Sequence, residues 1–219
     1  MNWNWDYAWE VLPGIVGEGL LITLEVTVFA SLVAYVVGLV LALLRRSPVA
    51  VVRWVVWAFI EFVRSTPLIV QVFFMFFVLP NIGITLDPVP TGVITIGLHY
   101  ATYTAEVYRA GIEAVPAGQW EAATALSLPR GRVWFAVILP QAIPRVLPAL
   151  GNYSISLLKE TPILLTIGVL DIVGAAYQEG SENFRYVEPI TIAGVLFLVL
   201  SYSASLLVRR LERRVARSN

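Results

Sequence analysis

The sequence predicts an all-α integral membrane protein, a single domain of 219 residues with five transmembrane helices. Its composition is 58% hydrophobic and only 14% charged, and a mean hydropathy of +0.77 exceeds what a soluble domain of this size needs for its core. The apolar residues gather in runs of the length that crosses the ~30 Å hydrocarbon core of a bilayer. The 15 basic and 15 acidic residues cancel, so the position of each charge carries the information.

Residues 1–19 are expected to form an ordered lead-in outside the cell. They contain acidic residues but no lysine or arginine, so they lack the basic start of a cleavable signal peptide. Their alternating aromatic residues suit a membrane interface rather than nucleic acid, because no basic residues accompany them. These aromatic residues are Trp3, Trp5, Tyr7 and Trp9.

Three predicted spans lie in the first half of the chain. Residues 20–44 contain no basic residue and form span one. Residues 49–80 form span two, which carries three charged residues inside it. The loop 81–90, with two prolines and a glycine, leads to span three at 91–108.

Residues 114–140 interrupt the apolar runs with the most polar stretch between spans. Alanine and leucine favour helix there, whereas Ser127, Pro129 and Gly131 break it. The stretch therefore predicts two short amphipathic helices that meet at a turn on the membrane surface.

The remaining chain supplies two further spans. Residues 133–158 are apolar but contain three prolines, so this segment is expected to bend before span four begins. Residues 163–177 are too few for an ordinary crossing and predict a half-buried helix that stays on one side. A polar loop then leads to span five at 189–208 and a basic tail at 209–219.

The basic residues predict the orientation, because lysine and arginine collect in cytoplasmic loops. Twelve of the 15 form three groups, and only an odd number of spans, with the N-terminus outside, puts all three groups in the cytoplasm. The groups are Arg45, Arg46 and Arg53; Arg109, Arg130, Arg132 and Arg145; and Arg209, Arg210, Arg213, Arg214 and Arg217.

The polar stretch reads Glu121-Ala122-Ala123, three residues, Ser127, nine residues, and then Val137-Ile138-Leu139-Pro140. This spacing resembles the EAA loop of binding-protein-dependent ABC importer permeases, with Ser127 in the position of the family's glycine. The alternative is a cytoplasmic connector with no such role. Segments on both sides, within residues 19–208, also resemble the polar amino acid branch: residues 19–24, 61–71, 108–113 and 116–120.

The resemblance implies a type I ABC importer permease fold in the cell membrane. It also implies two separate ABC ATPase subunits, an extracytoplasmic substrate-binding protein, and a second permease copy or a similar permease subunit. The sequence has no glycine-rich phosphate-binding motif, so we expect ATP hydrolysis on the partner chain, with no enzyme activity, catalytic residue, metal site or cofactor here. The residues expected to couple to the ATPase are Glu121, Ala122, Ala123, Ser127, Gly131, Leu139 and Pro140.

Some of these coupling residues have specific expected roles. Ala122 and Ala123 are small enough to let a partner groove approach closely, and Glu121 is expected to cap or pair at the start of its helix. Serine tolerates a left-handed backbone less well than glycine does, so the turn at Ser127 is expected to be reshaped.

Charged residues at membrane depth cost ~2.5–3.5 kcal/mol each on insertion scales and are functional candidates by default. Glu61 and Arg64 share a helix face, and the alternative to a substrate role is a mutual ion pair that locks span two. Lys159 and Glu160 lie at a predicted helix break, where free backbone groups can meet a ligand. The predicted substrate pathway comprises Glu61, Arg64, Thr66, Gln71, Lys159, Glu160 and Thr161. The single histidine, His99, is expected to be hydrogen-bonded within the membrane rather than a metal ligand.

Three classes of function are open to a membrane protein of this composition. An ABC importer permease agrees with the motif, whereas an ion-gradient-driven secondary transporter predicts an internal inverted repeat that the halves do not show. A membrane enzyme predicts a catalytic constellation that the sequence lacks. Within the polar amino acid branch, residues 46–53 and 184–189 most resemble permeases for ectoine and hydroxyectoine.

Overall fold

The computed structural model describes residues 3–217, and every regular element in that range is a helix, which confirms the all-α class. The α-helices are α1 Trp5–Gly14, α2 Leu20–Leu44, α3 Ala50–Ser65, α4 Leu68–Phe73, α5 Pro88–Glu113, α6 Ala117–Ala125, α7 Arg130–Arg132, α8 Leu139–Glu160, α9 Ile172–Glu182 and α10 Val187–Arg217. The π-helical segments are Ile15–Gly19, Phe74–Val78 and Val133–Ile138, and the 3-10 segments are Leu79–Ile82 and Thr161–Ile167.

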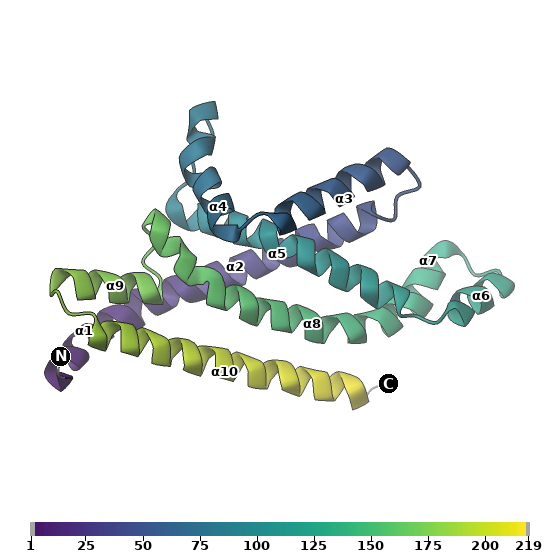
Figure 1. The fold of residues 1–219 in the computed structure, drawn as a ribbon. Helices are drawn as coiled ribbons and strands as arrows, with labels where there is room; N and C mark the ends of the chain where they lie inside the picture. Colours follow the sequence, from purple (N-terminus) through teal and green to yellow (C-terminus); the bar gives the residue numbers. More distant parts are fainter. Residues whose placement is uncertain (1–2, 218–219) are drawn as a thin grey trace.

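The long helices run roughly side by side, with α2 and α5 in the middle (Figure 1). On one side of this pair lie α3 and α4, and on the other lies α8, followed by α10. Helices α6 and α7 form a hairpin at one end, here called the hairpin end, and α1 and α9 lie at the opposite end, here called the N-terminal end. The N-terminus and C-terminus lie towards opposite ends, the arrangement expected for an odd number of spans.

Span one begins earlier than predicted, because α1, a π-helical segment and α2 make one helical stretch of 40 residues, Trp5–Leu44. Asn4 starts it by accepting hydrogen bonds from the backbone N–H groups of Asp6 and Tyr7. The lead-in is therefore helical from Trp5, and its position outside the cell stays a prediction.

Small residues let α2 and α5 pack closely. A Cβ added to Gly38 would clash with Thr104, whose hydroxyl donates a 2.6 Å hydrogen bond to the Ala34 carbonyl. Such small and hydroxyl-bearing positions allow close helix contact in membranes. Next to this contact lies the largest buried cluster, which comprises Val26, Ala30, Ala34, Val72, Ile96, Tyr100, Leu157, Leu164, Ile167 and Val169.

Span two is bent, whereas the sequence predicted one continuous run. α3 ends at Ser65, α4 begins at Leu68, and the helices on either side of the break differ in direction by 105°. Pro67 has no N–H to donate and forces Thr66 into an extended conformation (φ −103°, ψ 137°). The charges of the predicted span therefore all lie on α3, before the bend.

One prediction for the second half is wrong, and another stays a prediction. The helical stretch Arg130–Ile167 is continuous and α8 runs through both Pro144 and Pro148, so the bend expected before span four stays a prediction. Packed neighbours tolerate the missing N–H groups of prolines in membrane helices. The run 163–177, predicted as one helix, is divided at Gly168, whose φ of 83° ends the 3-10 segment before α9 begins.

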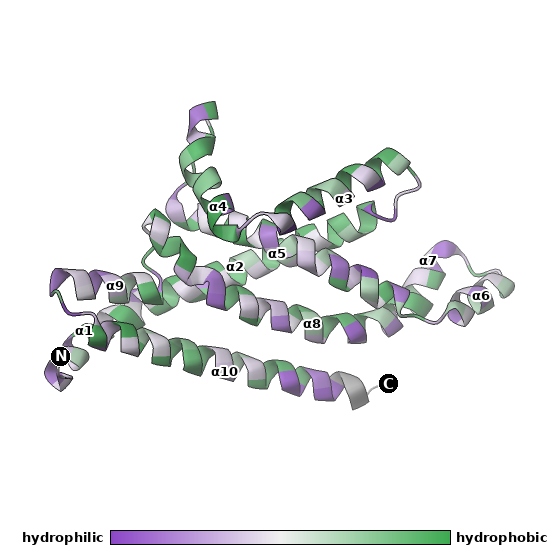
Figure 2. Cartoon of the chain, viewed as in Figure 1, coloured by the Kyte–Doolittle hydropathy of each residue, from purple (hydrophilic) through white to green (hydrophobic). Residues whose placement is uncertain are grey.

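The number of crossings is only partly defined by apolarity. Three stretches of the described chain are long and apolar enough to cross a membrane, and the bent pair α3–α4 makes up to a fourth. α5 has 26 residues but carries many polar ones, and its threonines pack inside the protein. Hydrophilic residues concentrate at the hairpin end and along the last turns of α10 (Figure 2). The count of five spans therefore stays a prediction.

Candidate functional site

The 114–140 hairpin is firmly attached to the spans. Trp120 of α6 packs edge to face on Trp134, with ring centroids 5.4 Å apart. Arg46, from the turn between α2 and α3, places its guanidinium 5.5 Å from the Trp134 ring centre. The two predicted short helices are confirmed, and they contact both neighbouring parts of the chain.

Ser127 keeps the turn that glycine would make. Its φ is 51°, in the left-handed region, directly after Leu126, the C-cap residue of α6. The Leu128 N–H donates to the Ala123 carbonyl at 3.1 Å and the Ser127 N–H to the Thr124 carbonyl at 2.9 Å, which is the Schellman motif. The expectation of a reshaped turn is therefore wrong, since serine accepts the strained conformation.

Ser127→Gly is expected to raise the free energy of unfolding by about 0.5–1 kcal/mol, because glycine has no Cβ to strain at positive φ. Thermal unfolding of the purified permease checks this, and Ser127→Val should shift the midpoint downward. Equal midpoints for the two variants would contradict the left-handed turn.

The coupling residues do not share one surface. Glu121 and Ala122 are exposed, whereas Ala123 is only 3% exposed and packs inside the hairpin. The prediction that Ala123 faces a partner groove is therefore wrong. Glu121 is the fifth residue of α6, so it does not cap the start of that helix either.

The surface of the hairpin shows large apolar side chains that the motif did not identify. Leu126 is 72% exposed and Phe135 is 75% exposed, on opposite sides of the turn. Gly131 is exposed and a Cβ added there would meet open space, Leu139 is half-buried, and Pro140 is exposed in the first turn of α8. Leu126 and Phe135 are therefore apolar side chains that a partner could contact at this end of the molecule.

A second cluster surrounds the bend between α3 and α4. The Gln71 Nε2 group donates to the carbonyls of Val63 and Thr66 at 2.7 and 3.1 Å, and its Oε1 lies 3.2 Å from Nδ1 of His99. Gln71 thus satisfies carbonyls that the broken helix leaves free. The expectation that His99 is hydrogen-bonded is confirmed. The hydrogen bonds of Gln71 and Thr66 thus stabilise the bend itself.

Arg64 lies beside an aromatic cluster of α5 and α8. Its guanidinium lies 5.0 Å from the Tyr103 ring centre. Tyr153 of α8 contacts both tyrosines of α5, with ring centroids 6.1 Å from Tyr100 and 5.8 Å from Tyr103. Glu160 is the last residue of α8, about two turns beyond Tyr153, so it lies on the same face of that helix. A cation of α3 and three tyrosines therefore lie together, with an acidic residue at the end of α8.

These tyrosines were not predicted as functional residues from the sequence. Tyr100 and Tyr103 are three residues apart on α5, so their side chains lie close together on that helix. Two tyrosines at this spacing within a predicted span, away from its ends, were the signal that could have found them.

Lys159 and Thr161 lie apart from this cluster. Lys159 lines a cleft of about 390 Å³ against α10, together with Pro162, Phe197 and Ser201. Thr161 is fully buried and donates a 3.0 Å hydrogen bond to Asp171, which caps α9. The prediction that Thr161 faces a passage is therefore wrong.

Glu61 lines a polar cleft of about 440 Å³ that extends from Arg64 to the hairpin end. Arg45 pairs with Glu106 at 2.5 Å, and Arg109 pairs with Glu106 at 2.8 Å and Glu113 at 2.5 Å. In the described chain Glu61 and Arg64 form no ion pair with each other, so the proposed ionic lock within span two is absent. No group of three metal-binding side chains occurs among residues 3–217.

Comparison with known proteins gives consistent matches over nearly the whole chain. Residues 34–217 match the family described as binding-protein-dependent transport system inner membrane component. The probable amino-acid ABC transporter permease protein y4tG of Sinorhizobium fredii is 44% identical over 218 residues, covering 95% of this chain and 93% of its own. The arginine transport system permease protein ArtQ of Bacillus subtilis is 35% identical over 216 residues, covering 98% of each.

A solved structure agrees with this result. The crystal structure of an amino acid ABC transporter with histidines has a chain that is 34% identical and matches with a TM-score of 0.92, covering 98% of this chain and 100% of its own. A MetNI methionine ABC transporter structure, 21% identical with a TM-score of 0.77, shares the fold. The chain therefore belongs to the family of binding-protein-dependent transport system inner membrane components.

Proposed function

We propose that this permease subunit carries polar amino acids or related zwitterionic solutes through the membrane as part of an ATP-driven ABC importer. The observation that carries the proposal is the likeness, over 98% of the chain, to a solved amino acid ABC transporter. Relatives named for arginine, cystine and glutamine transport support the same solute class. An ion-gradient-driven transporter receives no support from these relatives.

ATP hydrolysis belongs to two separate ATPase subunits, which dock on the 114–140 hairpin. The exposed Glu121, Ala122 and Leu126 form the contact, and the attached Trp120 and Trp134 pass the movement of the hairpin into the spans. An extracytoplasmic binding protein delivers the solute, and a second permease copy or similar subunit completes the channel.

The hairpin end faces the cytoplasm, the N-terminus lies outside, and the chain crosses the membrane five times. The arginine groups at the hairpin end and in the last turns of α10 support this orientation. A reporter fused after Asn219 should be active in the cytoplasm, and activity restricted to the outside would overturn the orientation.

The solute passes between Arg64 and Glu160. Arg64 meets the carboxylate, Glu160 meets the ammonium or amidinium group, and the polar cleft with Glu61 continues towards the hairpin end. Ectoine and hydroxyectoine are the specific solutes that the sequence resemblance favours.

The test reconstitutes permease, ATPase subunits and binding protein in proteoliposomes. Amino acids and ectoines are then compared for binding-protein affinity and for ATP-dependent uptake. A zwitterionic solute should accumulate only when ATP is present on the side of the membrane that holds the ATPase subunits. Accumulation driven by an ion gradient without ATP would contradict the proposal.

A further inference from the structure

The turn between α9 and α10 has a residue that its local geometry disfavours. Phe184 follows Asn183, the C-cap residue of α9, and has a φ of 51°. The Arg185 N–H donates to the Gly180 carbonyl at 2.8 Å, so the turn has the hydrogen bond of a Schellman motif. Glycine is the usual residue at this position because a Cβ is strained there.

The Phe184 side chain gains nothing from the rest of the chain. It is 87% exposed, the highest value among the large hydrophobic side chains of the described residues. The strained backbone lowers stability, and the unburied ring contributes no burial energy that would offset this cost. Local costs of this kind are typical of functional positions.

The residues that follow hold the turn rigid. The Arg185 Nε donates to Glu188 at 2.9 Å, and the Arg185 guanidinium lies 5.9 Å from the Tyr7 ring centre. This hydrogen bonding raises the pKa of Arg185, so the pair stays charged. The Tyr186 ring packs on Gly180 and on Tyr177. The backbone at Phe184 is therefore held in place, and binding would cost it little backbone conformational entropy.

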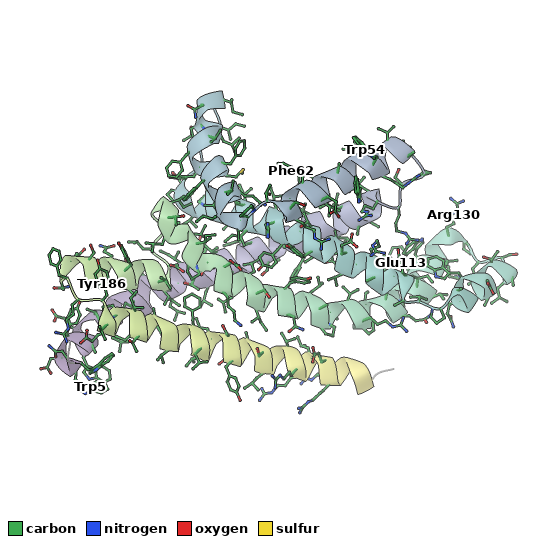
Figure 3. The ribbon with its side chains drawn as sticks, viewed as in Figure 1. Trp5, Trp54, Phe62, Glu113, Arg130 and Tyr186 are labelled. Atoms are coloured by element: carbon green, nitrogen blue, oxygen red, sulfur yellow. The ribbon has the colours of Figure 1, made fainter. Side chains whose placement is uncertain are left out.

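The surroundings of Phe184 are aromatic and acidic. Tyr177 and Tyr186 are 48% and 40% exposed, and Tyr186 lies at the same end as Trp5 (Figure 3). Among residues 3–20 and 168–190 Arg185 is the single base, and Glu188 neutralises it. The exposed acidic side chains at this end include Asp6, Glu10 and Glu182. This composition disfavours insertion among anionic lipid phosphates and suits a basic protein surface.

We propose that Phe184 is an anchor for the extracytoplasmic binding protein, which would receive its ring in an apolar pocket with a basic rim. The aromatic anchor supplies affinity, and the acidic surroundings attract the basic rim. The proposal rests on the proposed function, since it needs a binding protein and the N-terminal end outside the cell. Phe184 is then the residue at which the permease and the binding protein meet.

The experiment measures ATP hydrolysis of the complete transporter in nanodiscs against the concentration of its own purified binding protein. Phe184→Gly should raise the thermal midpoint of the transporter by about 2 °C. The same variant should require about tenfold more binding protein for half-maximal stimulation. A higher thermal midpoint together with a weaker response to the binding protein distinguishes an anchor from a structural residue. Ile84→Ala, which truncates a 48% exposed side chain on a different loop, is the matched control and should respond as wild type.

Labelling gives an independent readout, because the chain contains no cysteine. Phe184→Cys should react with a membrane-impermeant maleimide from outside, and saturating binding protein should protect it. Unchanged half-maximal concentration in Phe184→Gly, or no protection of the cysteine, would overturn the anchor. A cysteine inaccessible until detergent is added would also overturn it, by showing that the ring sits in the bilayer. If the wild-type complex itself ignores its binding protein, the proposed function is wrong and not only the anchor.

Discussion

Leu126→Asp is expected to lower ATP-dependent uptake by about 100-fold or more, which corresponds to about 2.7 kcal/mol of lost coupling. Leu126 is 72% exposed at the end of α6, so the change leaves the core of the permease intact. In the complex, the same side chain would be covered by the ATPase, and a buried unpaired carboxylate costs far more than a lost leucine contact. Co-purification of the ATPase subunits and uptake in proteoliposomes measure the effect.

Ala123→Leu provides the contrast. Ala123 is 3% exposed, so added methyl groups would overpack the hairpin and destabilise it by about 1–3 kcal/mol. We expect this variant to lose thermal stability, and Leu126→Asp to keep it. Normal ATPase docking in Leu126→Asp would show that the contact lies elsewhere on the hairpin.

Glu160→Gln and Arg64→Met are each expected to lower uptake by about 100-fold while the complex assembles and hydrolyses ATP. In the proposed pathway each change removes a charge that would meet one end of a zwitterion, and the aromatic cluster stays in place. Uptake of radiolabelled solute and basal ATP hydrolysis are measured on the same proteoliposomes.

Two controls separate transport from structure. Lys159→Met, at the neighbouring position but facing α10, should transport nearly as well as wild type. Combining Glu61→Gln with Arg64→Met should not restore uptake, because the two side chains form no ion pair in the described chain. Rescue by the double variant would favour the ionic lock, and normal kinetics in Glu160→Gln would exclude Glu160 from the pathway.

Hydrophobic runs predicted the helices well where the apolar run is uninterrupted. The predicted end of span one, residue 44, is the end of α2, whereas the helical stretch continues towards the N-terminus as far as Trp5 through residues that are not uniformly apolar. The bend at Thr66–Pro67 could not be predicted from apolarity. The bend leaves backbone carbonyls without helical partners, and the side chain of Gln71, several residues further along the chain, donates hydrogen bonds to them. Likewise, α8 continues through Pro144 because packed neighbours decide whether a proline breaks a membrane helix.

The proposed functional residues were likewise only partly predictable from the sequence. Spacing identified the 114–140 hairpin. It could not tell that Ala123 faces inward while Leu126 faces outward, because the helix is short and ends in a tight turn, so the sequence pattern does not define its packed face. Charge at membrane depth singled out Arg64 and Glu160 as candidates. It could not separate Glu160 from Lys159, because adjacent helical residues point about 100° apart and only the structure shows that Lys159 faces α10.

The adjacent arginines in the turn between α2 and α3 connect this turn to two different parts of the protein: Arg45 binds Glu106 of α5, and Arg46 stacks on Trp134 of the hairpin. α3 extends from this turn for 16 residues, ~24 Å at 1.5 Å per residue, and carries Arg64 near its far end. When α3 tilts as a rigid body about this turn, its far end therefore moves most. A tilt of about 5° there would displace Arg64 by about 2 Å, which is enough to make or break a hydrogen bond. In the proposed pathway, a small rotation of the hairpin would thereby move Arg64 relative to the solute.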